Sequence, residues 1–320
     1  MAEVGPDAEW SRLAARPPAS VSGSKAWLEA AFAAAHPHAT PHLLAVDAGP
    51  RLVGLLPLAL HMHAAAPTLR FAGAPHNDLS DVLAAPGWEA GVAATVVRHL
   101  TALSERGWAV ELENLDPDGV LAAAGPAALQ WDGHEPAPVI DLTGPWRQAA
   151  SGQRRRQWGR RRRRLHEGRR VEVRRLDGPA VVEALPEFVA IRAARLRATG
   201  RPLDEPPIAF LEAAVRALAP SGRCMMMDLR VDGRCVARDL YVLEHPTALM
   251  WLRALDTAWL RYSCGHLLLH ATAEALAAEG YERLDLGRGD EPYKFVFGAC
   301  RRVLLRAELR PQDDPDPRSP

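Results

Sequence analysis

The sequence predicts a two-domain α/β protein, and three observations carry that prediction. Both halves arrange their predicted elements in the same order: helix, hairpin, strand, long helix, a glycine followed by an aromatic residue, and strand. The long helices end in matching segments, residues 102–108 and 275–281, which indicates a structural duplication. The chain has 320 residues, of which 48% are hydrophobic, and this is enough for one large or two ordinary domains. Two unrelated domains of similar pattern are the alternative.

The first half begins with a helix expected over residues 24–35, capped by Ser24 or Ser22. Two apolar runs follow, and Asp-Ala-Gly-Pro between them is a hairpin signal. Gly107 ends a later run with apolar residues at helical spacing. The predicted strands are 42–46, 51–60, 69–72 and 108–112, and the second helix is 88–105.

The second half gives the same series. Asp232-Gly233 joins two apolar runs and is a strong two-residue hairpin signal. Gly280 ends the long helix of this half. The predicted helices are 186–196, 208–218 and 265–279, and the predicted strands are 224–231, 235–243, 248–255, 283–286 and 303–309.

These elements predict four regions. An N-terminal domain covers residues 1–150, an arginine-rich linker helix 151–170, and a C-terminal domain 171–310. The proline- and aspartate-rich segment 311–320 is predicted to be a disordered tail.

Composition narrows the class of protein. The formal net charge is zero, with 39 basic and 39 acidic residues, which excludes global disorder. Only Lys25 and Lys294 are lysines, so almost every basic residue is arginine. The N-terminus lacks an apolar leader, and the longest apolar stretch, 52–60, is too short to span a membrane. The four cysteines form no Cys-x-x-Cys pair, and the histidines have no acidic or cysteine partner at ligand spacing. We therefore expect a soluble, cytoplasmic protein without a metal or a disulfide framework.

The most distinctive motif is Asp285-Leu-Gly-Arg-Gly-Asp-Glu-Pro-Tyr-Lys294. Together with the Arg154–Leu165 run, Val231-Asp-Gly-Arg-Cys-Val-Ala237 and the Ser263-Cys-Gly265 start of a helix, it resembles the CelD-type acetyltransferase-like family, named from cellulose biosynthesis, within the GNAT superfamily. The first half agrees through residues 52–58 and 69–73, so the resemblance covers about residues 20–305. The architecture is also similar to that of the Fem-type aminoacyl transferases.

The resemblance implies two GNAT-like acyl-CoA N-acyltransferase domains in tandem, with mixed sheets flanked by helices. It implies direct transfer of an acetyl or other acyl group from acyl-CoA to the amine of a small-molecule acceptor. Two alternatives remain open. One is a Fem-like transferase that uses aminoacyl-tRNA, and the other is a non-catalytic GNAT scaffold in polysaccharide or natural-product assembly.

The resemblance places the acyl-CoA pyrophosphate at the start of the helix that follows residue 263, because a helix N-terminus suits phosphate. This loop departs from the usual GNAT pattern, since it has one glycine, and His266 stands where a small residue is expected. The alternative is that Ser263 only caps the helix and Gly265 only packs. The donor-binding candidates are Arg261, Ser263, Cys264, Gly265 and His266.

The 285–294 motif is the main candidate for the reaction itself. Arg288 suits a carboxylate or phosphate, and Asp285 or Asp290 suits an ammonium group. Tyr293 is a candidate to protonate a leaving thiolate, and Lys294 to anchor an anion. Salt bridges Asp285–Arg288 or Asp290–Lys294 that only rigidify the loop are the alternative.

The remaining candidates come from a strand and a loop. Asp239 in strand 235–243 is the candidate base, with Glu244 as a weaker choice, and Tyr241 and Tyr262 compete with Tyr293 as the acid. In the first half, Asp78 and Asp81 suit a cationic amine acceptor, although a plain turn is the more common origin of such a polar loop.

Residues 154–170 contain ten arginines, with Trp158 and Leu165 forming a thin apolar stripe. Three interpretations remain open. The segment is a solvated linker helix packed by this stripe, it contacts the phosphates of coenzyme A, or it binds tRNA or another nucleic acid through phosphate charge.

Overall fold

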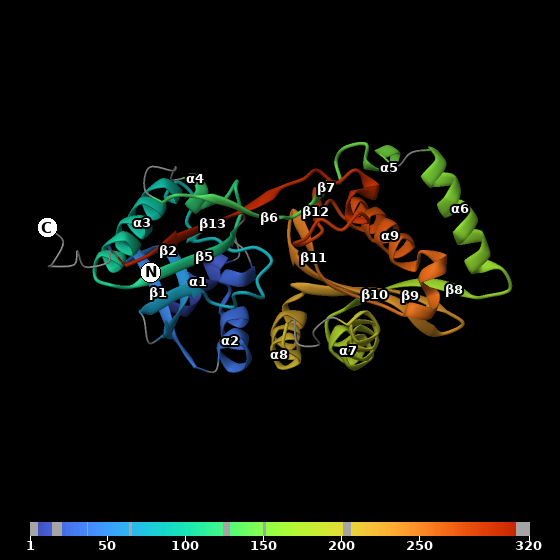
Figure 1. Cartoon of the computed structure of the whole chain (residues 1–320), viewed down its shortest axis with the longest axis horizontal. Helices are drawn as coiled ribbons and strands as arrows, with labels where there is room; N and C mark the ends of the chain where they lie inside the picture. Colours follow the sequence, from blue (N-terminus) through green and yellow to red (C-terminus); the bar gives the residue numbers. More distant parts are fainter. Residues whose placement is uncertain are drawn as a thin grey trace, which may run out of the picture. The chain divides into compact units, whose positions relative to one another are not determined.

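The computed structural model describes residues 6–14, 21–36, 38–63, 66–123, 129–149, 152–200 and 206–311 (Figure 1). The chain forms two compact units. The N-terminal unit consists of Met1–Glu135 together with Val303–Pro320, and the C-terminal unit consists of Pro136–Arg302. No helix within the described residues is long and apolar enough to cross a membrane.

The N-terminal unit is built on a mixed sheet in the order β1-β2-β3-β5-β13-β6, with β4 beside β2. The pairs β1–β2, β2–β3, β2–β4 and β5–β13 are antiparallel, and the pair β3–β5 is parallel. The strands are β1 (Ala39–Ala48), β2 (Arg51–Met62), β3 (Pro67–Phe71), β4 (Leu83–Ala84), β5 (Ala109–Leu115), β6 (Asp132–Pro136) and β13 (Val303–Leu309). The helices are α1 (Pro6–Ala14), η1 (Val21–Gly23), α2 (Lys25–Ala34), α3 (Glu89–Glu105) and α4 (Val120–Ala123).

The C-terminal unit has a second mixed sheet, in the order β7-β12-β11-β10-β9-β8. Only β11 and β12 run parallel to each other. The strands are β7 (Val139–Asp141), β8 (Val171–Asp177), β9 (Cys224–Val231), β10 (Arg234–Glu244), β11 (Thr247–Leu255) and β12 (Arg283–Asp285). The helices are α5 (Trp146–Ala149), α6 (Gly152–His166), α7 (Pro179–Thr199), α8 (Ile208–Leu218), η2 (Ala219–Ser221), η3 (Thr257–Tyr262), α9 (Cys264–Ala278) and η4 (Lys294–Phe297).

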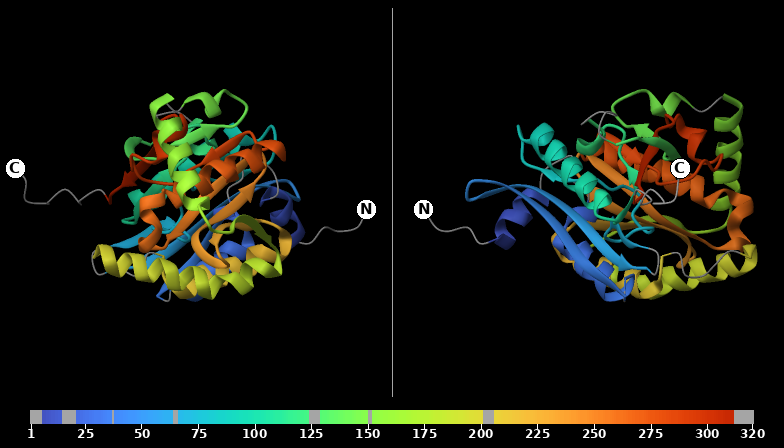
Figure 2. Two further views of the ribbon diagram at one scale, coloured as in Figure 1. Left: turned by 90° about the vertical axis from the view of Figure 1, so that its right-hand side faces the viewer. Right: turned by 60° about the vertical axis from the view of Figure 1, so that its left-hand side comes forward.

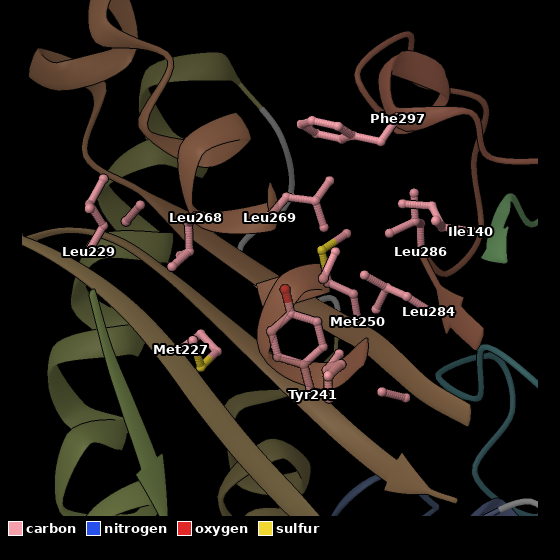
Figure 3. Close-up of a cluster of buried hydrophobic side chains, with 14 of the residues drawn as sticks. Ile140, Met227, Leu229, Tyr241, Met250, Leu268, Leu269, Leu284, Leu286 and Phe297 are labelled. Carbon is pink, nitrogen blue, oxygen red and sulfur yellow. The ribbon is translucent and has the colours of Figure 1, made fainter. Parts of the chain in front are cut away.

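Helices cover both faces of the second sheet, α9 on one face and α7 and α8 on the other (Figure 1). On the α9 face, Leu268 and Leu269 pack with Met227, Tyr241 and sheet residues around them in one buried cluster (Figure 3). Because the apolar residues of α9 recur at helical spacing while those of the strands alternate, the two elements bury one common surface. This packing fixes the position of the first turn of α9 relative to β11.

The predicted repeat is confirmed in both units. Each contains a hairpin, a third strand, a long helix and a strand that runs parallel to the third one. Each long helix is followed by a glycine in a left-handed conformation, with φ of 89° at Gly107 and 86° at Gly280. Ser24 caps α2 as predicted, since its side chain accepts a hydrogen bond from the N–H of Trp27.

One predicted helix needs correction, and one strand was not predicted. The helix expected over 186–196 is α7, which starts at Pro179 and contains Pro186 in its interior. Pro179 occupies the position where proline is favoured, and burial of Val181, Leu185 and Phe188 outweighs the hydrogen bond lost at Pro186. Strand β8 was not predicted, because its charged residues hide its alternation.

The structure also divides the chain differently from the predicted ranges 1–150, 151–170 and 171–310. Strand β13 follows the C-terminal unit in the sequence but pairs with β5 in the N-terminal unit. Conversely, β7 precedes α6 and pairs with β12 in the C-terminal unit. The sequence pattern predicted strand 303–309 but not its partner in the other unit, and it did not predict β7. The predicted disordered tail lies outside the described residues beyond Pro311.

Candidate active site at the divergence of two parallel strands

The central feature of the C-terminal unit is the point where β11 and β12 part. The two strands pair over three residues each, Thr247–Leu249 with Arg283–Asp285. Strand β12 then ends, whereas β11 continues to Leu255. A register shift against β10 gives β11 one extra residue in this stretch, because Leu240 faces Leu252 and Tyr241 faces Met250. The second half of β11 therefore lies beyond its pairing with β12.

The 285–294 motif folds into a tight loop directly after β12. Gly287 and Gly289 have φ of 68° and 105°, a backbone region that favours glycine. The buried Asp285 carboxylate accepts a hydrogen bond of 2.9 Å from the Gly287 N–H and forms an ion pair with Arg302. Asp285 therefore stabilises the loop through its own backbone contact and through Arg302.

Lys294 lies beneath this loop and is 3% exposed. Its ammonium group donates to the carbonyl oxygens of Gly287 at 3.1 Å and Gly289 at 3.4 Å, and to that of Arg288. Its acidic partner is Glu291 at 3.0 Å, not the predicted Asp290. The buried charge thus holds three consecutive carbonyl groups on one side of the loop. Arg288 is half-buried and Asp290 is exposed in the same loop.

Asp239, the predicted base, forms a buried ion pair. It is fully buried, and its two carboxylate oxygens accept hydrogen bonds of 2.7 Å each from Nε and Nη2 of Arg253 on β11. The Tyr241 hydroxyl donates to the same carboxylate at 3.2 Å. Burial alone would lower the pKa of Arg253, but Asp239 more than offsets this and raises it above its ordinary value. The arrangement favours a positioning role for Asp239.

Arg253 connects this pair to Tyr293. Its guanidinium lies 4.8 Å from the centroid of the Tyr293 ring, a cation–π contact. Burial raises the pKa of the Tyr293 phenol to about 12, while Arg253 acts in the opposite direction. Tyr293 therefore carries its proton at neutral pH. Arg253 was missed in the sequence, although a single arginine inside the apolar run of β11 was the available signal.

The start of α9 borders the same pair. A Cβ added to Gly265 would lie 3.2 Å from Leu255 and 3.5 Å from Nη1 of Arg253, so glycine allows α9 to pack closely on β11. The buried Ser263 is left-handed, with φ of 59°, and does not cap the helix through its side chain, whose oxygen accepts a hydrogen bond from Arg161. Arg261 is exposed and lies over the Tyr262 ring.

Two donor-site candidates have packing roles. Burial raises the pKa of the Cys264 thiol to about 12, so this cysteine is not an activated nucleophile. The His266 ring lies among aromatic rings, with centroids 6.0 Å from Trp158, 6.3 Å from Tyr293 and 6.5 Å from Phe297. Of the predicted donor residues, Gly265 lies beside Arg253 and His266 lies beside Tyr293. Among the residues that the structure describes, no cluster of His, Cys, Asp and Glu has a metal-binding arrangement.

Asp78 and Asp81 belong to the N-terminal unit. Asp81 is 6% exposed, and its carboxylate accepts hydrogen bonds from the N–H groups of Val82, Val120 and Leu121. Burial raises the pKa of Asp81 to about 6, while these backbone donors act in the opposite direction. Asp81 therefore anchors the start of α4. Asp78 is half-buried in the same loop.

Glu244 at the end of β10 predicts a pH dependence of stability. Burial raises its pKa from 4.5 to about 8, Arg223 opposes the shift, and Asp285 adds to it. Since the folded protein binds this proton more tightly than the unfolded chain, stability is fully present below about pH 4.5 and is lost as the pH rises through about 8. We expect urea unfolding between these values to show a loss of up to about 1.4 kcal/mol per pH unit from this group. Glu244→Gln should remove that slope, and an unchanged slope in the variant would contradict the assignment.

Known protein families and solved structures include proteins similar to this chain. Residues 152–295 match the family model described as "Acetyltransferase (GNAT) domain". Among solved structures, the chain is similar to FemX, with a TM-score of 0.70 and 10% identity over 96% of each chain. It is also similar to the C-terminal domain of a putative lysylphosphatidylglycerol synthetase from Agrobacterium fabrum, with a TM-score of 0.62 and 14% identity over 95% of this chain and 91% of that one. L-PGS from Bacillus licheniformis gives a TM-score of 0.56 and 14% identity over 89% of this chain and 91% of that one.

These identities show the fold alone, and that fold spans both units. A search of curated proteins found no match. The predicted fold class, tandem GNAT-like units with mixed sheets flanked by helices, is confirmed. The GNAT match also supports an acyltransferase activity, whereas the narrower resemblance to the CelD-type family stays a prediction.

Proposed function

We propose that the C-terminal unit transfers an acyl group, most simply acetyl, from acyl-CoA to the amine of a small-molecule acceptor. One observation carries this proposal. Beyond the last β11–β12 pair, Arg253 is fixed by Asp239 and holds the ring of the protonated Tyr293 beside the start of α9. Three groups thus lie within the segment that matches the GNAT family model. They are the phenol of Tyr293, the part of β11 that does not pair with β12, and the N-terminus of α9.

The first turn of α9 suits the phosphates of the donor substrate. Arg161 donates to Ser263 there, and Arg261 lies on η3 directly before it. Two arginines and the positive end of a helix favour an anion. We therefore assign Arg261 and the backbone N–H groups of Cys264 and Gly265 to donor binding. Gly265 has no side chain and packs closely on β11, so it would bind the donor through its backbone N–H.

Each proton transfer of the proposed reaction is assigned to a residue of the chain or to water. The acceptor nitrogen attacks the thioester carbonyl, and the carbon–sulfur bond breaks. Tyr293 donates its phenolic proton to the leaving thiolate and recovers a proton from water. The amine gives its surplus proton to water, because both oxygens of Asp239 are already bonded to Arg253. Asp239 and Arg253 position Tyr293 without touching the reacting atoms.

The function is tested by release of free thiol from acetyl-CoA in the presence of primary amines such as glucosamine and lysine. We expect acetyl-CoA to raise the thermal unfolding temperature and an amine to stimulate thiol release. A transferase that takes its acyl group from aminoacyl-tRNA would show neither effect, and a non-catalytic scaffold would show no turnover with either donor. Absence of both effects with acetyl-CoA would overturn the proposal.

Tyr293→Phe tests the acid. The variant keeps the ring that contacts Arg253 and loses only the hydroxyl, so we expect kcat to fall about 100-fold with the KM for acetyl-CoA unchanged. Tyr262→Phe is the matched control, since Tyr262 also lies against an arginine, but on η3. Wild-type kcat in Tyr293→Phe, or an equal loss in the control, would show that another group protonates the thiolate.

A further inference from the structure

Helix α6 lies on the outside of the C-terminal unit (Figure 2). Its sequence contains a row of arginines. Arg156, Arg160 and Arg163 recur every three or four residues and so share one side of the helix, with Arg162 and Arg164 next to them. All five are exposed, and within the described part of the chain none of their side chains has an acidic partner. The helix itself contains no acidic residue. Five like charges on three turns repel one another, so the row lowers the stability of the folded protein. Stability therefore does not explain why these arginines are present.

The other side of α6 is fixed to the unit. Leu165 is fully buried in the core, and the Trp158 ring lies 4.7 Å from that of Phe297. Arg161 donates to Ser263 at the start of α9. Helix α6 is therefore a packed element and not a loose linker, and it holds the arginine row on a rigid frame.

The arginine side of α6 is hollowed. Arg156, Gly159, Arg160, Arg162, Arg163 and His166 line an open hollow on the protein surface. Gly159 lies in the helix interior, where glycine costs about 1 kcal/mol relative to alanine. Apart from its chain neighbours and the backbone of α6 itself, no atom of the described residues lies within 4 Å of the place a Cβ would take, so packing does not require this glycine. Its absence of a side chain lets a ligand approach the helix backbone between the arginines.

The basic surface continues from α6 onto η3, against which α6 packs. The Arg169 guanidinium lies 5.8 Å and 5.5 Å from the ring centroids of Trp259 and Tyr262. Arg261 lies 5.0 Å from the Tyr262 centroid on η3. Aromatic contacts thus hold two more arginines in place at one end of the row.

We propose that this surface binds the phosphate backbone of a nucleic acid. Helix α6 is about 22 Å long, and a nucleic-acid strand places one phosphate about every 3.4 Å, so the row meets several phosphates in succession. The forked guanidinium bonds phosphate oxygens in pairs. A lipid surface fits less well, because the apolar side of α6 is buried in the core and has nothing to insert. A row of like charges is attracted mainly to phosphates, so we expect binding to follow the backbone and not the sequence.

The test is fluorescence anisotropy of labelled single-stranded RNA and DNA of about 16 nucleotides with the full chain, over a series of salt concentrations. The variant R156A/R160A/R163A removes three charges from the row, and R98A/R216A/R301A removes three exposed arginines elsewhere. Both triple variants change the net charge equally. We expect the first to bind at least about 10-fold more weakly and to reduce the slope of log K against log salt by about 2. We expect the second to bind like the wild type.

Several outcomes would overturn the proposal: no saturable binding to either oligonucleotide at low salt, equal loss in the two triple variants, or binding to phosphatidylglycerol vesicles but not to oligonucleotides. Equal binding of RNA and DNA supports backbone recognition. The inference does not depend on the proposed acyl transfer. Thiol release from acetyl-CoA should be unchanged in R156A/R160A/R163A, so failure of one proposal leaves the other testable. Thermal unfolding of each variant checks that the fold is retained.

Discussion

Replacing Arg253 with methionine will lower the free energy of unfolding by about 3–5 kcal/mol, because it leaves the Asp239 carboxylate buried without its partner. The same change removes the cation against which the Tyr293 ring packs, so acyl transfer should fall below detection. Urea unfolding followed by circular dichroism measures the first effect, and thiol release from acetyl-CoA measures the second. A stable, active Arg253→Met protein would contradict both the burial argument and the positioning role.

A double variant separates stability from catalysis. Asp239→Leu combined with Arg253→Met removes both charges, and apolar replacement of a buried ion pair is often neutral or stabilising. We therefore expect the double variant to recover most of the lost stability but none of the activity. Recovery of activity together with stability would show that the pair has only a structural role and that Tyr293 needs no help from Arg253.

Lys294→Met should have the second largest effect. The ammonium group lost in this variant bonds three loop carbonyls and Glu291 from a buried position, so we expect a loss of about 3 kcal/mol in unfolding free energy. The loop that carries Tyr293 would no longer be held in one conformation. Because small misplacements of a reacting group are costly, kcat should fall about 100-fold even where the protein remains folded.

The other lysine of the chain provides the control. Lys25 is 43% exposed, and its ammonium group lies 4.0 Å from Glu29, so Lys25→Met should change stability by less than about 0.5 kcal/mol. Equal effects of the two lysine substitutions, on stability and on kcat, would contradict the proposed role of Lys294 in the loop.

The elements that the sequence predicts best are those with local physical causes. Asp232 and Gly233 take φ of 50° and 82°, the left-handed pair that a two-residue hairpin requires. Strand β9 ends directly before this turn, and β10 starts directly after it. Helix α8 has the predicted bounds, since its apolar spacing is regular. Tyr293 and Lys294 could be singled out for a different reason, because they lie in the motif that carries the family resemblance.

Partners distant in the sequence could not be predicted. The pattern around residue 285 suggested only a nearby arginine, whereas the structure also pairs Asp285 with Arg302, 17 residues further along the chain. Asp239 could be read as a base only because its register opposite Arg253 was unknown. In each case the missing information is which strand lies beside which, and this depends on the whole sheet.

The path of the chain has a consequence for synthesis. Strand β13, at residues 303–309, lies between β5 and β6 in the interior of the N-terminal sheet. Translation delivers residues 136–302 before it delivers residues 303–309. The C-terminal unit can therefore complete its sheet while the N-terminal sheet still lacks an inner strand. The unit that leaves the ribosome first is therefore the last to close. Until then it exposes the edges of β5 and β6, and a chain that stops after residue 302 would keep those edges open to other strands.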